Sequence, residues 1–92
     1  MTWMVHTEID YGRGNKVGYD GRYSTEGYRL VQEAAIQACR APGKDVIASI
    51  QARNGQGMTL ILEGMHWSQA ALCQFQDAEF LATEMYAREV LR

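Results

Sequence analysis

Cysteine and long apolar runs are scarce in this chain, and their scarcity sets the first limits on what the protein can be. Two of the 92 residues are cysteines. No apolar run approaches the ~18 residues that a helix needs to span a bilayer, and no basic-then-apolar leader precedes the strand-like start of the chain. We therefore expect one cytoplasmic domain, residues 1–92, that does not interact with a membrane.

Residue sets that would perform catalysis or bind metal are also missing. Cys39 and Cys73 fall in two different expected helices and should be free thiols in a reducing compartment, although a disulfide between the helices stays open. Neither His6 nor His66 has a Cys, Asp or Glu at a ligand spacing that repeats, so we expect neither metal nor cofactor. No G-x-S-x-G, Walker or H-E-x-x-H motif occurs. The sequence therefore predicts no catalytic residue.

Charge is limited as well. The formal net charge is −2, which weighs against a general nucleic-acid binder, because such proteins need cations to neutralise phosphates. Residues 1–44 contain six Lys or Arg and five acids, a net charge of +1, whereas residues 45–92 contain three and six, a net charge of −3. We expect a small acidic protein whose second half carries the negative charge.

A short motif occurs twice. Residues 20–24 read Asp-Gly-Arg-Tyr-Ser, and residues 63–68 read Glu-Gly-Met-His-Trp-Ser. Each copy follows a glycine-rich turn and precedes a long amphipathic segment, and its serine is of the type that caps helix N-termini. The repeat predicts two strand–turn–strand–helix units.

Alternation of apolar and polar residues predicts the strands. The expected strands are residues 2–11, 16–20, 45–53 and 58–63. In the second hairpin, the apolar faces of the two strands coincide only if Asn54 pairs with Met58, because a slip of one residue would turn every side chain over. That register leaves a three-residue loop and requires a positive φ at Gly57.

Two helices should follow Ser24 and Ser68, the first ending at Pro42-Gly43 and the second reaching Arg92. The expected core is Trp3, Val5, Ile9, Val31, Ala35, Ile50, Leu60, Leu62, Phe75, Ala82 and Tyr86. The predicted fold class is therefore a two-layer α+β domain of order ββα-ββα. Its sheet should be four-stranded and mostly antiparallel, with two helices on one face.

The last helix has a second apolar stripe, formed by Cys73, Phe80 and Leu91 and flanked by Asp77 and Glu84. At 100° per residue, these residues lie roughly 120–140° from the main apolar face. A helix packed only on its own sheet does not need such a stripe. We predict a surface that binds a protein partner or a second copy of the chain. The alternative is contact with the N-terminal hairpin or with the chain ends.

Aromatic and basic residues also interleave in the first hairpin, as in proteins that bind single-stranded nucleic acid. The residues concerned are Tyr11, Arg13, Lys16, Tyr19 and Arg22. The glycines of residues 12–18 join two strands rather than a strand and a helix, so they indicate a hairpin turn and not a phosphate loop. Nucleic-acid binding through this hairpin is the alternative function.

The element order after Ser24, with the strand of residues 2–11 in front, resembles that of two groups of small regulators. One comprises the DinI-type modulators of recombinase filaments, which share a β-α-β-β-α order and an acidic last helix. The other comprises small phage-encoded α+β inhibitors of the anti-CRISPR kind, often acidic and without catalytic residues. This chain departs from them in its additional N-terminal hairpin and in Arg88 and Arg92 at the end of the last helix.

The leading hypothesis is a non-enzymatic protein-binding module. The resemblance implies an inhibitor, encoded by a phage or mobile element, that occupies a surface of a larger nucleic-acid-handling partner. A homodimer, weak binding of single-stranded nucleic acid, and a small enzyme of unknown class are the alternatives.

Overall fold

The computed structural model describes residues 1–41 and 43–91. Pro42 and Arg92, the predicted helix ends, lie outside the described residues. The elements are β1 (Thr2–Asp10), β2 (Lys16–Ser24), α1 (Thr25–Arg40), β3 (Val46–Asn54), β4 (Thr59–Trp67) and α2 (Gln69–Val90). Their order confirms the predicted ββα-ββα arrangement and the α+β class.

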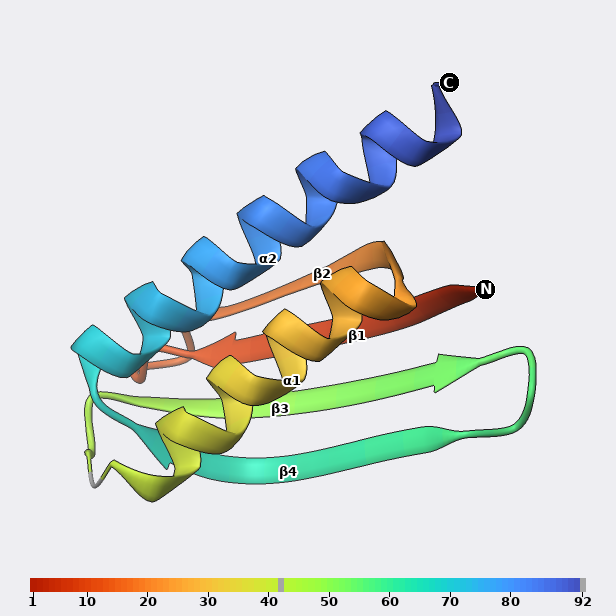
Figure 1. Ribbon diagram of the computed structural model, residues 1–92. Coiled ribbons are helices and arrows are strands. Elements are labelled where there is room, and N and C mark those ends of the chain that lie inside the picture. The colour runs from red at the N-terminus through yellow and green to blue at the C-terminus, as the bar shows by residue number, and fades with distance from the viewer. Residues whose placement is uncertain (42, 92) are drawn as a thin grey trace.

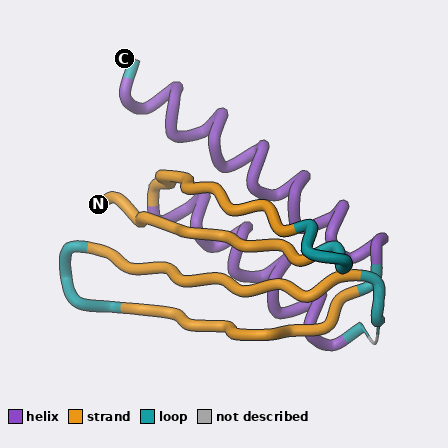
Figure 2. Tube along the Cα trace, turned by 180° about the vertical axis from the view of Figure 1, so that it is seen from behind, coloured by secondary structure: helices purple, strands orange, loops and turns teal. Residues whose placement is uncertain are grey.

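The four strands form one antiparallel sheet in the order β2-β1-β3-β4. The central pair, β1 and β3, therefore joins two different hairpins. Figure 1 shows α1 and α2 on the same face of this sheet. Figure 2, drawn from behind, shows the strands in front of both helices, and no helix or strand of residues 1–41 and 43–91 covers the second face. The predicted two-layer architecture is present.

The register predicted for the second hairpin is confirmed. The Asn54 amide donates to the Met58 carbonyl at 3.1 Å, and the Gly57 amide donates to the Asn54 carbonyl at 3.3 Å. Gly57 has φ +82°, a conformation that favours glycine. Ile50 pairs with Leu62, so the apolar residues of both strands face the helices.

β4 is longer than predicted, because a bulge conceals its second half in the sequence pattern. The prediction ended the strand at Glu63. Gly64 has φ +65°, its amide donates to the Ser49 hydroxyl at 3.1 Å, and the ladder shifts register there. An extra residue reverses the alternation, so Met65 and Trp67 then take the core side. The apolar–polar alternation therefore breaks off at Glu63 because the bulge at Gly64 follows it.

β2 is also longer than predicted and continues past Asp20 to Ser24. A Cβ at Gly21 would overlap the hydroxyl group of Tyr23. The absence of a side chain at Gly21 thus leaves the space into which the Tyr23 phenol folds, on the helix side of the sheet. Sequence alternation missed this stretch because a glycine stands where an apolar residue would mark the inner face.

Both serines of the repeated motif cap helices, as predicted. The Ser24 hydroxyl accepts from the Gly27 amide at 3.3 Å, and the Ser68 hydroxyl accepts from the Ala71 amide at 3.1 Å. Each contact satisfies a backbone donor that the first turn of a helix leaves unpaired.

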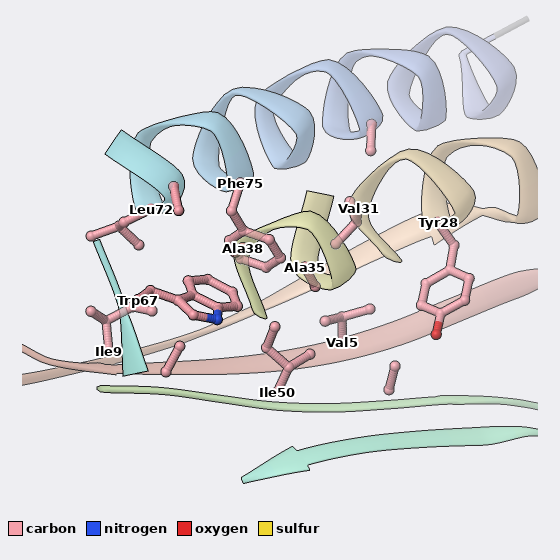
Figure 3. Packing of buried hydrophobic residues seen from close by; sticks show 14 of the residues in the cluster. Val5, Ile9, Tyr28, Val31, Ala35, Ala38, Ile50, Trp67, Leu72 and Phe75 are labelled. Atoms are coloured by element: carbon pink, nitrogen blue, oxygen red, sulfur yellow. The ribbon is translucent and has the colours of Figure 1, made fainter. Parts of the chain in front are cut away.

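The core lies between the sheet and the two helices (Figure 3). Eight of the eleven predicted core residues are buried, whereas Leu60, Leu62 and Tyr86 are half-buried. Leu60 and Leu62 belong to β4, an edge strand, and Tyr86 lies in the second half of α2. The core residues absent from the prediction are Tyr23, Tyr28, Ala38, Val46, Ala48, Ala52, Trp67, Ala71 and Leu72.

Candidate functional site

Four of the five residues of the predicted stripe and its flanks lie on the outward side of α2 and the fifth, Leu91, is its C-cap; all five are exposed. They are Cys73, Asp77, Phe80, Glu84 and Leu91. Phe80 exposes 68% of its surface and Leu91 exposes 84%. The stripe therefore does not pack on the N-terminal hairpin. Exposed apolar side chains that share one line of a helix, with polar neighbours around them, are typical of binding surfaces.

The second half of α2 has little support from the rest of the fold. Beyond Ala82 no described side chain of the helix is buried, and only Met85 and Tyr86 are half-buried. Figures 1 and 2 both show the last turns of the helix extending away from the sheet. Val90, on another side of the helix, exposes 60% of its surface. The end of α2 is therefore apolar on more than one exposed side.

The flanks of the stripe are mostly acidic. Glu84 lies 3.9 Å from Arg88 on the next turn, and both side chains are at least partly exposed, so this pair contributes little to stability. Asp77 has no ion-pair partner among residues 1–41 and 43–91. Carboxylates beside an exposed phenylalanine present a face with negative potential and an apolar centre.

A cluster of polar groups occupies the inward side of the same helix. Glu79 is only 7% exposed, and three hydroxyl groups surround its carboxylate. Thr7 donates to Oε2 at 3.3 Å, Tyr23 reaches Oε2 at 3.5 Å, and Tyr19 donates to Oε1 in a short contact. These donors belong to β1 and β2, so the cluster joins α2 to the first hairpin.

Burial raises the pKa of Glu79 from its ordinary value of 4.5 to about 6. Desolvation disfavours the ionised form, and this effect exceeds the opposing effect of the three hydrogen bonds, which favour it. The pKa values of Tyr19 and Tyr23 are raised as well, chiefly by burial and then by the neighbouring carboxylate. Both phenols therefore remain protonated and act as donors throughout the physiological range.

The structure brings together only part of the alternative nucleic-acid site. Tyr11 and Arg13 lie at the tip of the first hairpin, beside Lys16 at the start of β2, whereas Tyr19 turns inward to the buried carboxylate. Lys16 and Arg22 stand at opposite ends of β2, which are roughly 20 Å apart at 3.3 Å per residue. Of the two tyrosines in this set only Tyr11 is exposed, so in the part of the chain that the structure describes these cations do not surround two exposed aromatic rings.

The uncovered face of the sheet carries a mixture of polar and apolar side chains, and all of those named here are exposed. These are Met4, His6, Glu8, Ile47, Gln51, Arg53, Thr59, Ile61 and Glu63. On β2, the Asp20 carboxylate lies 2.8 Å from Nδ1 of the His6 ring and is the acceptor of this contact. Arg22 and Arg53 flank Met4 in one row, at the edge of a shallow hollow. None of these side chains is Phe, Tyr or Trp, and the one aromatic ring among them, His6, contacts Asp20, so the face lacks the row of large aromatic rings on which successive bases stack.

Sequence reasoning missed Glu79, although a weak signal was present. Its position interrupts the main apolar stripe of the helix between Phe75 and Ala82. An acid on the buried side of a helix requires partners. Its partners are Thr7, Tyr19 and Tyr23, and the sequence pattern places Tyr19 in the alternative nucleic-acid site.

Among the described residues, no group of three or more His, Cys, Asp or Glu side chains is arranged to bind a metal ion. Cys39 is half-buried, Cys73 is exposed, and both are free. No helix in the described ranges is both long and apolar enough to cross a membrane.

Comparison with protein-family models, with curated proteins and with solved structures finds no match to this chain. Functional inference therefore depends on the geometry of α2 and of the sheet.

Proposed function

We propose that the protein is a non-enzymatic binding module that inserts the outward side of α2 into a groove of a larger protein partner. The observation that carries the proposal is Phe80, which is 68% exposed although it lies at the middle of the helix. Leu91 lies on the same line. Helices that dock in grooves present anchors of this kind, and one central aromatic anchor often supplies much of the binding energy.

The charge of the stripe favours a basic rim on the partner's groove. Asp77 and Glu84 flank the anchor, and complementary charges around an apolar centre both steer association and fix the orientation. An inhibitory role follows from the same chemistry. An acidic helix that occupies a basic groove excludes nucleic acid from it, so the proposal includes inhibition of a partner that handles nucleic acid. The similarity of the element order to small phage-encoded inhibitors is the ground for proposing an origin in a phage or mobile element.

A second copy of the chain is a poorer occupant. In a twofold-symmetric pair the same surface meets itself. Two antiparallel α2 helices centred on Phe80 would place Asp77 of one copy beside Glu84 of the other. Like charges brought together in this way oppose association. The proposal therefore commits to a partner with basic groups, and self-association is an outcome that the experiment must distinguish.

The test compares Phe80→Asp with Ile36→Asp. Ile36 and Phe80 each lie twelve residues after the serine that caps their helix. Ile36 is apolar and 38% exposed, so its substitution adds the same charge to the other helix. Tagged parent and variant proteins are used to capture partners from a nuclease-treated lysate, with quantification by mass spectrometry. A photo-crosslinking amino acid at position 80 identifies what contacts that position.

The proposal predicts a protein with a basic surface that the parent and Ile36→Asp capture and that Phe80→Asp loses at least tenfold. The same protein should be crosslinked from position 80. Capture that is equal for all three proteins would contradict the proposal. A crosslink from position 80 to a second copy of this chain would replace the proposed partner with a homodimer.

A further inference from the structure

Glu79 is the only buried carboxylate among the described residues, and no cation compensates it. From β1 it faces the Thr7 hydroxyl, and from β2 it faces the phenols of Tyr19 and Tyr23. The part of α1 that meets this region of α2 is apolar, with Gly27 against Ala82. No Lys, Arg or His of the described ranges forms an ion pair with Glu79.

This environment distinguishes between the two forms of the carboxyl group. An ionised carboxylate away from water is costly unless a cation or enough donors replace its hydration. Three hydroxyl groups replace part of it. A protonated carboxyl group needs less replacement of its hydration, because it is uncharged. It donates one hydrogen bond itself, and the same hydroxyl groups supply the others. The cluster therefore satisfies both forms and favours the neutral one.

The place of Glu79 along α2 gives this preference a local consequence. On its N-terminal side the helix is fixed by Leu72 and Phe75, which are fully buried. On its C-terminal side only Ala82 is buried, and burying an alanine contributes little compared with a large side chain. The hydrogen bonds of Glu79, together with Ala82 and the half-buried Met85 and Tyr86, therefore hold the second half of α2 on the rest of the fold.

We propose that the Glu79 cluster is a proton-dependent switch that holds the second half of α2, residues 79–90, on the first hairpin. The protonated carboxyl group keeps this half-helix docked, and ionisation favours its release while the sheet and the first turns of α2 stay folded. The inference depends on the cluster alone and holds whether or not a partner binds the outward stripe.

The direction and size follow from linkage. The docked state binds the proton more tightly than the released state, so docking is strongest below the ordinary pKa and weakens as the pH rises. With a pKa of about 6 when docked and 4.5 when released, ionisation shifts the equilibrium by at most about thirtyfold toward release. Nearly all of that change falls between pH 4 and pH 7.

Hydrogen exchange resolved by residue on the whole chain provides the test. Protection factors, corrected for the intrinsic effect of pH, are compared at pH 4 and pH 7.5 for amides of residues 80–87 and of β3. Parent, Glu79→Gln and Glu33→Gln are measured together. Glu33 is an exposed acid on α1, so its substitution is the matched control for removing one carboxylate from a helix.

In the parent and in Glu33→Gln, protection of residues 80–87 should fall about twentyfold between the two pH values, relative to β3. In Glu79→Gln it should not change with pH. An equal fall in all three proteins would overturn the switch. Should Glu79→Gln not fold, the parent alone decides: protection of residues 80–87 that stays constant relative to β3 contradicts the proposal, and a selective fall supports it.

Discussion

The two ββα units of this protein share a skeleton and differ in what fills its centre. Tyr23 and Trp67 stand at the open ends of the two hairpins, each just before a capping serine. Tyr23 pairs with Trp3, and Trp67 pairs with Val46. Counted from these pairs, Thr7 of β1 is equivalent to Ile50 of β3. Thr7 and Ile50 are also partners across the central ladder, so a pseudo-twofold axis through that pair relates the units.

The equivalent positions around this axis have opposite chemistry. They are Thr7, Tyr19 and Glu79 in one set, and Ile50, Leu62 and Ala35 in the other. In each set, two residues face one another across a hairpin and the third comes from a helix. The same backbone therefore accommodates an apolar cluster on one side and a carboxylate with hydroxyl donors on the other.

The difference shows where stability depends on conditions. An apolar cluster is stabilised by removal of surface from water and is insensitive to protonation. A buried carboxylate is stabilised only while its partners and its protonation state are suitable. Sensitivity to pH should therefore belong to the side of the molecule where α2 meets the first hairpin, and not to the equivalent side.

The largest loss of stability should come from truncating a buried side chain at a helix position that the two units share. Phe75 and Val31 stand at equivalent positions of α2 and α1, and both are buried. Phe75 also packs on Trp67, with ring centroids 5.0 Å apart. Phe75→Ala should lower the free energy of unfolding by roughly 3–5 kcal/mol, and Val31→Ala by less, about 2 kcal/mol. Urea unfolding measures both, and equal losses would contradict the assigned packing.

Tyr19→Phe tests the polar set directly. It removes one donor from Glu79, which leaves the ionised carboxylate less well compensated. At pH 7.5 the free energy of unfolding should fall by about 1.5–3 kcal/mol, the usual value of a hydrogen bond to a charged group. At pH 4, where Glu79 is protonated, the loss should be smaller. A loss that is the same at both pH values would show that the hydroxyl does not act through Glu79.

The two hairpin loops also differ. The first loop has positive φ at Gly12, Arg13 and Gly14, and the second has it at Gly57. Gly57→Val should cost about 1–2 kcal/mol, because a β-branched residue is strained in the left-handed region. Gly55→Val, in the same loop without a positive φ, is the control and should cost less. Thermal unfolding of the two variants distinguishes them.

The smallest effect on stability should come from the stripe proposed for binding. Phe80→Asp should change the free energy of unfolding by no more than about 0.5 kcal/mol, because Phe80 is mostly exposed. Ile36→Asp, at the equivalent position of α1, should cost more since its side chain is better covered. A large loss for Phe80→Asp would mean that the residue belongs to the fold, and would remove the support for the binding proposal.

Periodicity predicted the class, the order of elements, both caps and the second hairpin, because these depend on local alternation and turn chemistry. It misjudged the ends of β2 and β4, where Gly21 and Gly64 interrupt the alternation without ending the strand. Periodicity did not predict the sheet order β2-β1-β3-β4, because pairing between the two hairpins leaves no local signal in the sequence.

The outward stripe of α2 was predictable because wheel positions alone separate Phe80 from the main apolar face, and the structure exposes it accordingly. The Glu79 cluster was not. Its partners lie on β1 and β2, far from Glu79 in the sequence, and hydroxyl donors are too common to indicate a buried acid in advance.

The most direct measurement is the titration of the Glu79 side-chain carboxyl carbon by NMR, with Glu33 of α1 as the exposed reference in the same spectra. A carboxylate buried without a cation should titrate with a pKa of about 6. Tyr19→Phe should move that pKa higher, because it removes a donor that favours the ionised form. A pKa at or below 4.5 would show that the cluster favours the ionised form and would contradict both the switch and the proposed contrast between the two units.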